Sequence, residues 1–81
     1  SEGRPSPGRL MLEAGRFSGI GFAEMRFAQL GLAQARVVRT REGRSESFRV
    51  VAGPYASVAA ADAALDRAIA AGIPDARIVV E

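Results

Sequence analysis

Residues 31–38, Gly-Leu-Ala-Gln-Ala-Arg-Val-Val, align without a gap to residues 72–79, Gly-Ile-Pro-Asp-Ala-Arg-Ile-Val. Each segment begins with a glycine, which commonly ends a helix, and continues into aliphatic residues typical of a strand. Each is preceded by a stretch that fits a strand and then a helix, so the sequence indicates two similar strand–helix–strand halves. The alternative is that two unrelated helix–strand junctions converged on the same residue types.

The elements around this repeat follow from hydrophobic spacing and turn residues. The spacing predicts strands at residues 10–17, 35–41, 46–53 and 75–80 and helices at residues 19–30 and 58–71, with Ser18 and Ser57 as N-caps. Two such halves fold most simply as an α+β structure, a βαββαβ ferredoxin-like domain with a four-stranded antiparallel sheet and both helices on one face. Right-handed crossovers give the spatial strand order 4-1-3-2. Residues 1–8 are rich in Pro, Gly and Ser and are expected to be a disordered linker end, so the domain covers residues 9–81.

Alternate residues of each strand should face the helices or the solvent. The expected core residues are Leu10, Leu12, Ala14, Ala35, Val37, Phe48, Val50, Ala52, Ala76, Ile78 and Val80. The residues expected on the opposite face are Met11, Glu13, Gly15, Arg36, Val38, Thr40, Arg49, Val51, Gly53, Arg77 and Val79. On that face arginines alternate with aliphatic residues, and Gly15 and Gly53 would leave a shallow depression. The pattern fits either a platform for an elongated ligand or an ordinary amphipathic sheet surface.

Composition argues against several classes of function. The chain has neither cysteine nor histidine, and its nine acidic residues show no spacing that pairs two of them for acid–base chemistry. We therefore expect a protein that is not an enzyme and that uses neither a metal nor another cofactor. The formal net charge of +2 is too small to indicate nucleic-acid binding. No apolar run approaches the roughly 20 residues that span a bilayer.

Three segments resemble the SPOR (sporulation-related repeat) family. Glu13–Ser18 is similar to the Gln-x-Gly-x-Phe opening of these domains, Phe48–Ser57 to their Tyr/Phe-Arg-Val-x-x-Gly-Pro-Phe signature, and residues 72–80 to their ending. The resemblance covers residues 9–81 and implies the fold predicted above. It also implies a module, expected to be monomeric, that binds bacterial peptidoglycan at denuded glycan strands, which lack stem peptides and accumulate at division septa. Such a module would bring its parent protein to the division septum, in the periplasm or cell envelope. Only other segments of that parent protein would contact the membrane.

The resemblance suggests how the sheet would bind its ligand. A muramic acid without its stem peptide has a free lactyl carboxylate, which suits the planar guanidinium of arginine. The expected glycan-binding residues are Glu13, Gly15, Arg36, Val38, Arg49, Val51 and Arg77, with Arg49 as the main contact. Glu13 stands where the family has glutamine and would repel a carboxylate, unless it pairs with Arg49 and thereby occupies that arginine.

Two other hypotheses remain at this point. The glutamate at position 13, and Phe22 where the family often has asparagine, would also fit a protein-interaction module whose glycan site has decayed. An RNA-recognition domain shares the topology but stacks bases on aromatic residues of the two central strands. No aromatic residue is expected on the solvent face of those strands, so RNA binding is the less favoured hypothesis.

Overall fold

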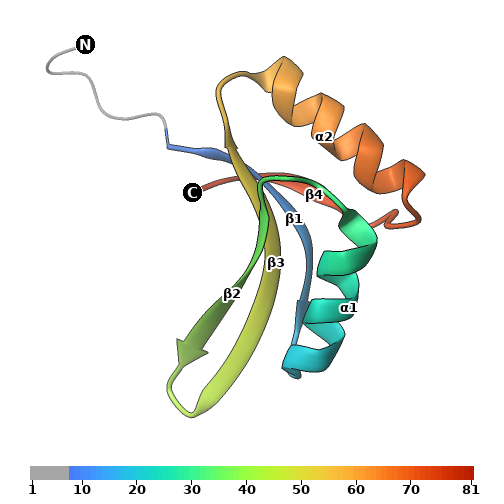
Figure 1. Cartoon of the computed structure of the whole chain (residues 1–81). Helices are drawn as coiled ribbons and strands as arrows, with labels where there is room; N and C mark the ends of the chain where they lie inside the picture. The colour runs from blue at the N-terminus through green and yellow to red at the C-terminus, as the bar shows by residue number, and fades with distance from the viewer. Residues whose placement is uncertain (1–7) are drawn as a thin grey trace, which may run out of the picture.

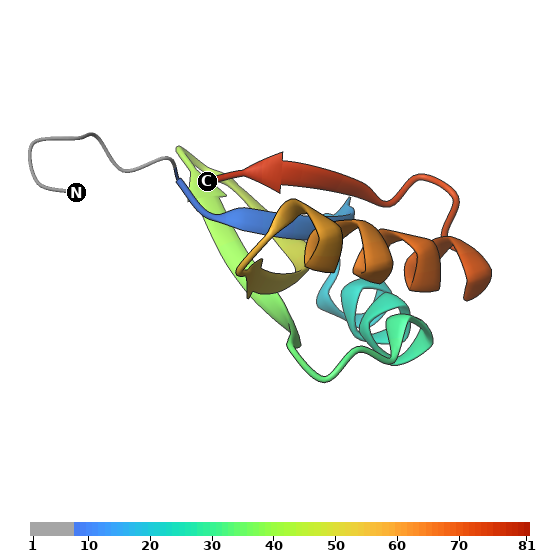
Figure 2. The same ribbon diagram turned by 90° about the horizontal axis from the view of Figure 1, so that it is seen from above.

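The computed structural model describes residues 8–81, so nearly all of the expected linker lies outside the described residues (Figure 1). The elements are β1 (Leu10–Phe17), α1 (Ile20–Leu30), β2 (Ala35–Glu42), β3 (Ser45–Tyr55), α2 (Val58–Ala70) and β4 (Arg77–Val80). The strands form one antiparallel sheet in the order β2-β3-β1-β4, which is the predicted order read from the other edge. Both helices lie on the same face of the sheet (Figure 2). The predicted fold is confirmed.

The helix ends follow local sequence signals in three of the four expected places. The Ser57 hydroxyl accepts a hydrogen bond from the Ala60 backbone N–H at 3.1 Å, as expected for an N-cap. Gly31 ends α1 with φ of 65°, and its N–H donates to the Phe27 carbonyl. Gly72, after α2, also has a positive φ. The prediction of Ser18 as a cap is wrong: Gly19 occupies that position, and no side chain caps α1.

The core lies between the sheet and the helices. Its buried members are Leu12, Ala14, Ala23, Leu30, Phe48, Val50, Ala52, Ala64, Ala68, Ile73 and Ala76. Small side chains of α2 allow this helix to approach the sheet closely, so the larger aliphatic side chains are mostly supplied by the strands and loops. The prediction that Val80 is a core residue is wrong, because 63% of it is exposed. Val80 ends the edge strand β4, opposite Leu10 at the start of β1.

A bulge in β1 changes which residues face the helices. Glu13 pairs with Val51 and Arg16 with Arg49, so β1 advances three residues while β3 advances two. Beyond the bulge Phe17 packs against the core, and Arg16 lies on the other face, beside Glu13. Strict alternation would have placed Arg16 among the residues that face the helices.

Gly15 is the residue that permits this bulge. Its φ is 130°, and a Cβ atom there would lie 2.9 Å from the Phe17 ring and 3.1 Å from Nη1 of Arg26. The same Arg26 nitrogen donates to the Ala14 carbonyl at 2.7 Å, so α1 is fixed against the bulge. The missing side chain of Gly15 is therefore on the helix side. The expectation that Gly15 hollows the opposite face is wrong.

Candidate functional site

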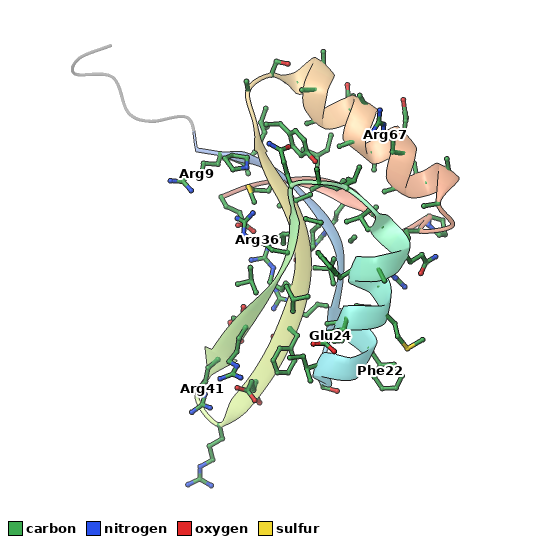
Figure 3. The ribbon with its side chains drawn as sticks, in the orientation of Figure 1. Arg9, Phe22, Glu24, Arg36, Arg41 and Arg67 are labelled. Carbon is green, nitrogen blue, oxygen red and sulfur yellow. The ribbon has the colours of Figure 1, made fainter. Side chains whose placement is uncertain are left out.

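We define the open face as the side of the sheet that the helices do not cover (Figure 3). The register places on it Met11, Glu13 and Arg16 from β1, Arg36, Val38 and Thr40 from β2, Arg49 and Val51 from β3, Arg77 and Val79 from β4, and Glu81 just after β4. The backbone thus brings four arginines from four different strands to one surface. Figure 3 shows the Arg36 side chain on this side, with Arg9 nearby.

Glu13 is the centre of the charged groups on the open face. One of its carboxylate oxygens accepts a hydrogen bond from Nε of Arg49 at 2.7 Å. The other accepts from Arg77 through Nη2 at 2.9 Å and Nε at 3.2 Å. A guanidinium nitrogen of Arg16 lies 3.8 Å from the first oxygen. Only 8% of the Glu13 side chain is exposed, so the carboxylate is shielded from water and surrounded by arginines.

The electrostatic balance of this cluster favours the ionised forms of Glu13 and Arg49. Burial of the Glu13 carboxyl acts to raise its pKa, but hydrogen bonds from Arg49 and Arg77 and their charges outweigh burial and hold the pKa below its usual value. Burial likewise acts to lower the pKa of Arg49, but Glu81 and Glu13 outweigh it and raise that pKa. Each of these two groups therefore favours the charged form of the other.

Arg49 is shared between two carboxylates. Its Nε donates to Glu13, and its Nη2 donates to the side chain of Glu81. Its side chain is only 15% exposed, whereas that of Arg77 is 70% exposed. The pairing of Glu13 with Arg49, which the sequence left open, is present in the structure. The residue expected to be the main ligand contact is thus already hydrogen-bonded within the protein.

The aliphatic residues form the floor of the open face. Met11 and Val51 are almost fully buried, and Val38 and Val79 are half-buried. A Cβ atom on Gly53 would lie 3.2 Å from Sδ of Met11 and 3.1 Å from the Leu10 carbonyl oxygen. Met11 therefore fills the space beside this glycine. The predicted depression at Gly53 is wrong, and the floor is packed.

Arg36 and Phe22 lie in different parts of the molecule. Nη1 of Arg36 donates to the Gly53 carbonyl at 2.9 Å, so this side chain bridges β2 and β3 across the open face. Phe22 is 67% exposed on α1, on the helix side of the sheet (Figure 3). The open face therefore contains all the predicted site residues except Gly15, and Phe22 is remote from it.

Sequence reasoning missed Arg16 and Glu81. A glycine inside a predicted strand often marks a bulge. A bulge at Gly15 could therefore have been considered from the sequence, and it would have placed Arg16 on the open face. Glu81 had no comparable signal, because its position depends on β4 pairing with β1. Its backbone exchanges hydrogen bonds with Arg9, at 2.7 Å and 2.9 Å, and this places its side chain beside Arg49.

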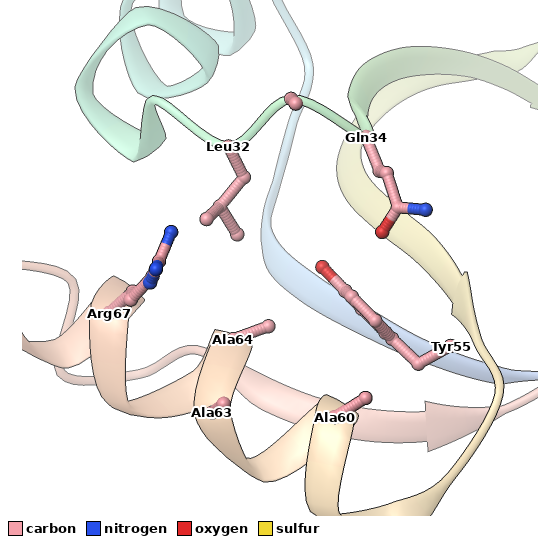
Figure 4. A pocket seen from close by; sticks show the side chains of 8 residues that line it. Leu32, Gln34, Tyr55, Ala60, Ala63, Ala64 and Arg67 are labelled. Carbon is pink, nitrogen blue, oxygen red and sulfur yellow. The ribbon is translucent and has the colours of Figure 1, made fainter.

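A cavity of about 280 Å³ lies elsewhere, between α2, the α1–β2 connection and the end of β3 (Figure 4). It is lined by Leu32, Ala33, Gln34, Tyr55, Ala60, Ala63, Ala64 and Arg67. Burial raises the pKa of the Tyr55 hydroxyl, an effect that the charge of Arg67 partly opposes. The lining is mainly alanine with a single charged side chain. The concentration of charge on the open face therefore distinguishes that face as the stronger candidate for a polar ligand.

Two further properties concern the residues from 8 to 81. Within this range, no three histidine, cysteine, aspartate or glutamate side chains are grouped so that they could hold a metal ion. No helix of the same segment is both long and apolar enough to cross a membrane.

The fold and this surface define a class: a small α+β module with two helices on one side of its sheet and an arginine-rich face on the other. The family model of the SPOR domain matches residues 6–79. The chain belongs to the SPOR domain family, as the sequence motifs predicted.

Two solved structures share the fold. The crystal structure of the RlpA SPOR domain from Pseudomonas aeruginosa superposes with a TM-score of 0.78 at 23% identity, covering 89% of this chain and 99% of that one. The solution structure of the peptidoglycan-binding domain of the B. subtilis cell wall lytic enzyme CwlC gives a TM-score of 0.73 at 21% identity, covering 100% and 99%. No curated protein matches the sequence.

Proposed function

We propose that this chain is a non-catalytic, monomeric module that binds bacterial peptidoglycan through its open face. Its preferred ligand is a denuded glycan strand, and it brings its parent protein to division septa in the cell envelope. Membership of the SPOR family and the fold shared with the peptidoglycan-binding domain of CwlC support this proposal. The observation that carries it is the set of four arginines on one uncovered sheet surface.

The charge of the open face suits an anionic polymer. The four arginines of the strands share the open face with two carboxylates, Glu13 and Glu81, which leaves two positive charges in excess. Arg77 and Arg36 are exposed and can donate further hydrogen bonds to a ligand. Each contact between an exposed arginine and a lactyl carboxylate contributes on the order of 1 kcal/mol. Affinity then comes from several successive muramic acids on one strand rather than from a single strong contact.

The packed floor suits the sugar rings. Val38 and Val79 present half-buried aliphatic surface between the arginines, and Met11 and Val51 support it from below. Pyranose rings carry C–H groups on their faces, which pack favourably on such surface. The open face thereby combines carboxylate recognition with contacts along the polysaccharide chain.

One observation favours a second candidate function. Glu13 already holds Arg49 and Arg77, the situation expected if the glycan site had decayed and the face bound a protein instead. RNA binding remains less favoured. Among the described residues, those that β1 and β3 place on the open face are Met11, Glu13, Arg16, Arg49 and Val51, and none is an aromatic platform for a base.

Binding to purified sacculi tests the proposal. Sacculi are digested with an amidase to remove stem peptides, and the fraction of pure domain that sediments is compared with untreated sacculi. We expect amidase treatment to increase the bound fraction. Equal binding to the two preparations would remove denuded glycan as the ligand, and saturable binding only to a protein partner would favour the second candidate.

Substitution of Arg49 tests the position of the site. Arg49→Ala should weaken binding to treated sacculi roughly three- to tenfold, because a partly shielded guanidinium–carboxylate contact is lost. Arg44→Ala is the matched control, since Arg44 is an exposed arginine of the hairpin turn between β2 and β3. Thermal melting of both variants checks that they fold. A folded Arg49→Ala variant with unchanged affinity would move the site away from Arg49.

A further inference from the structure

Glu81 is one of the two carboxylates that accept hydrogen bonds from Arg49. Its side-chain carboxylate accepts a hydrogen bond from Nη2 of Arg49, while Glu13 holds the Nε side. About two fifths of the Glu81 side chain, 38%, is exposed, whereas the Glu13 side chain is almost fully buried. A ligand approaching from solvent therefore meets Glu81 first. Of the two carboxylates on Arg49, Glu81 is the one that a ligand can displace.

The backbone of Glu81 is fixed even though its side chain is accessible. The Arg9 N–H donates to the Glu81 carbonyl, and the Glu81 N–H donates to the Arg9 carbonyl. These two bonds hold the Glu81 Cα beside β1, so little entropy is lost when its side chain reaches Arg49. The carboxylate thus competes for the guanidinium as an intramolecular group with a high effective concentration.

We propose that the Glu81 carboxylate is a built-in competitor that stands in for the ligand carboxylate on Arg49 and sets the affinity of the open face. The inference rests on the proposed function. When a lactyl carboxylate binds, it replaces Glu81 on Nη2, and one carboxylate–guanidinium contact is exchanged for another of the same chemistry. The net gain at Arg49 is consequently smaller than it would be without Glu81. Glu13 stays on the Nε side of Arg49 throughout.

Replacing Glu81 with glutamine tests this exchange. The variant keeps the length of the side chain and the backbone bonds to Arg9 but removes the competing charge. We expect Glu81→Gln to bind denuded glycan oligomers, obtained from amidase-digested sacculi, about three- to tenfold more tightly than the unsubstituted domain. Glu24→Gln is the matched control, because it removes the same charge from an exposed position on α1, on the helix side (Figure 3). That control should leave the affinity within about twofold.

A double-mutant cycle separates the specific contact from general attraction. In an Arg49→Ala background the same Glu81→Gln change should give no gain, because there is no guanidinium left to release. Titration with a chito-oligosaccharide, which lacks lactyl groups, should show no tightening in Glu81→Gln. Isothermal titration calorimetry supplies the affinities, and thermal melting shows whether each variant is folded.

Each outcome has a distinct meaning. A gain of at least threefold that disappears in the Arg49→Ala background supports the inference. Equal affinity of Glu81→Gln and the unsubstituted domain overturns it while leaving glycan binding intact. A gain of the same size in both backgrounds also overturns it, because the effect is then only the loss of a negative charge. Failure of every folded variant, and of the unsubstituted domain, to bind denuded oligomers defeats the proposed function and this inference together.

Discussion

Replacing Glu13 with glutamine should destabilise the domain, because this carboxylate joins β1 to both of its neighbouring strands through side chains. Glu13 accepts from Arg49 of β3 at 2.7 Å and from Arg77 of β4 at 2.9 Å, and its side chain is 8% exposed. Glutamine has the same length but is neutral, and its NH₂ group would face one guanidinium as a donor facing donors. The variant thus loses one charge-assisted contact and weakens the other.

The size of the effect follows from the exposure of the partners. A hydrogen bond between charged groups contributes about 1.5–3 kcal/mol when shielded, which applies to Arg49, and well under about 1 kcal/mol when one partner is largely exposed, which applies to Arg77. We expect a loss of about 2–3 kcal/mol in the free energy of unfolding. For a domain of this size each kcal/mol lowers the melting temperature by about 4–8 °C, so the melting temperature should fall by roughly 10–20 °C.

The loss of stability caused by Glu13→Gln should be smaller in acid than at neutral pH. Because the folded-state pKa of Glu13 is lowered, its carboxylate stabilises the fold fully above the unfolded-state pKa, and this contribution is lost as pH falls through the folded-state pKa. Urea denaturation of both proteins at about pH 7 should show the full difference, and at about pH 3 a smaller one. Glu24→Gln, on the exposed surface of α1, is the control and should change stability by less than about 0.5 kcal/mol. Equal stability of the Glu13→Gln and unsubstituted proteins at neutral pH would refute the reasoning, as would a difference that persists unchanged in acid.

Three further predictions have defined outcomes. Glu13→Gln should also tighten binding to denuded glycan in the calorimetric titration, because it releases Arg49 and Arg77; weaker binding by the folded variant would make Glu13 a ligand contact. Gly15→Ala should lower the free energy of unfolding by about 2–4 kcal/mol, because residue 15 has a positive φ and a Cβ there would lie 2.9 Å from the Phe17 ring. Gly21→Ala is the control and should not destabilise the domain, because a Cβ at that position meets nothing within 4 Å. Ser57→Ala should cost about 1 kcal/mol in urea denaturation by removing the cap of α2, and Ser18→Ala, at a position that caps nothing, should cost much less.

The fold was predictable because its main signals are local. The repeated glycine-to-aliphatic junctions at residues 31–38 and 72–79 mark where each helix ends and the next strand follows. Ser57 and Gly31 then act at the helix ends as their chemistry requires. The strand order followed from the handedness of the crossovers, which is a property of the chain rather than of particular residues.

The site was less predictable because it depends on register. Strict alternation placed Glu13 and Arg49 on the same face but cannot account for the bulge at Gly15, which changes the phase of β1 and brings Arg16 to that face. Alternation also says nothing about packing within a face, so Met11 and Val51 were expected to be open to solvent and are buried instead. The Glu81 contact needs the pairing of distant strands and had no signal in the sequence.

The extra residue in β1 changes which charges this strand presents to a partner of the sheet. Along a regular strand, side chains on one face recur every second residue, about 6.5–7 Å apart. Between Glu13 and Arg16 three residues of β1 span the same length as two residues of β3, and both side chains lie on one face, with a nitrogen of Arg16 3.8 Å from an oxygen of Glu13. A single glycine, Gly15, rather than a charged residue, thus determines that Arg16 is among the charges this strand presents to a partner.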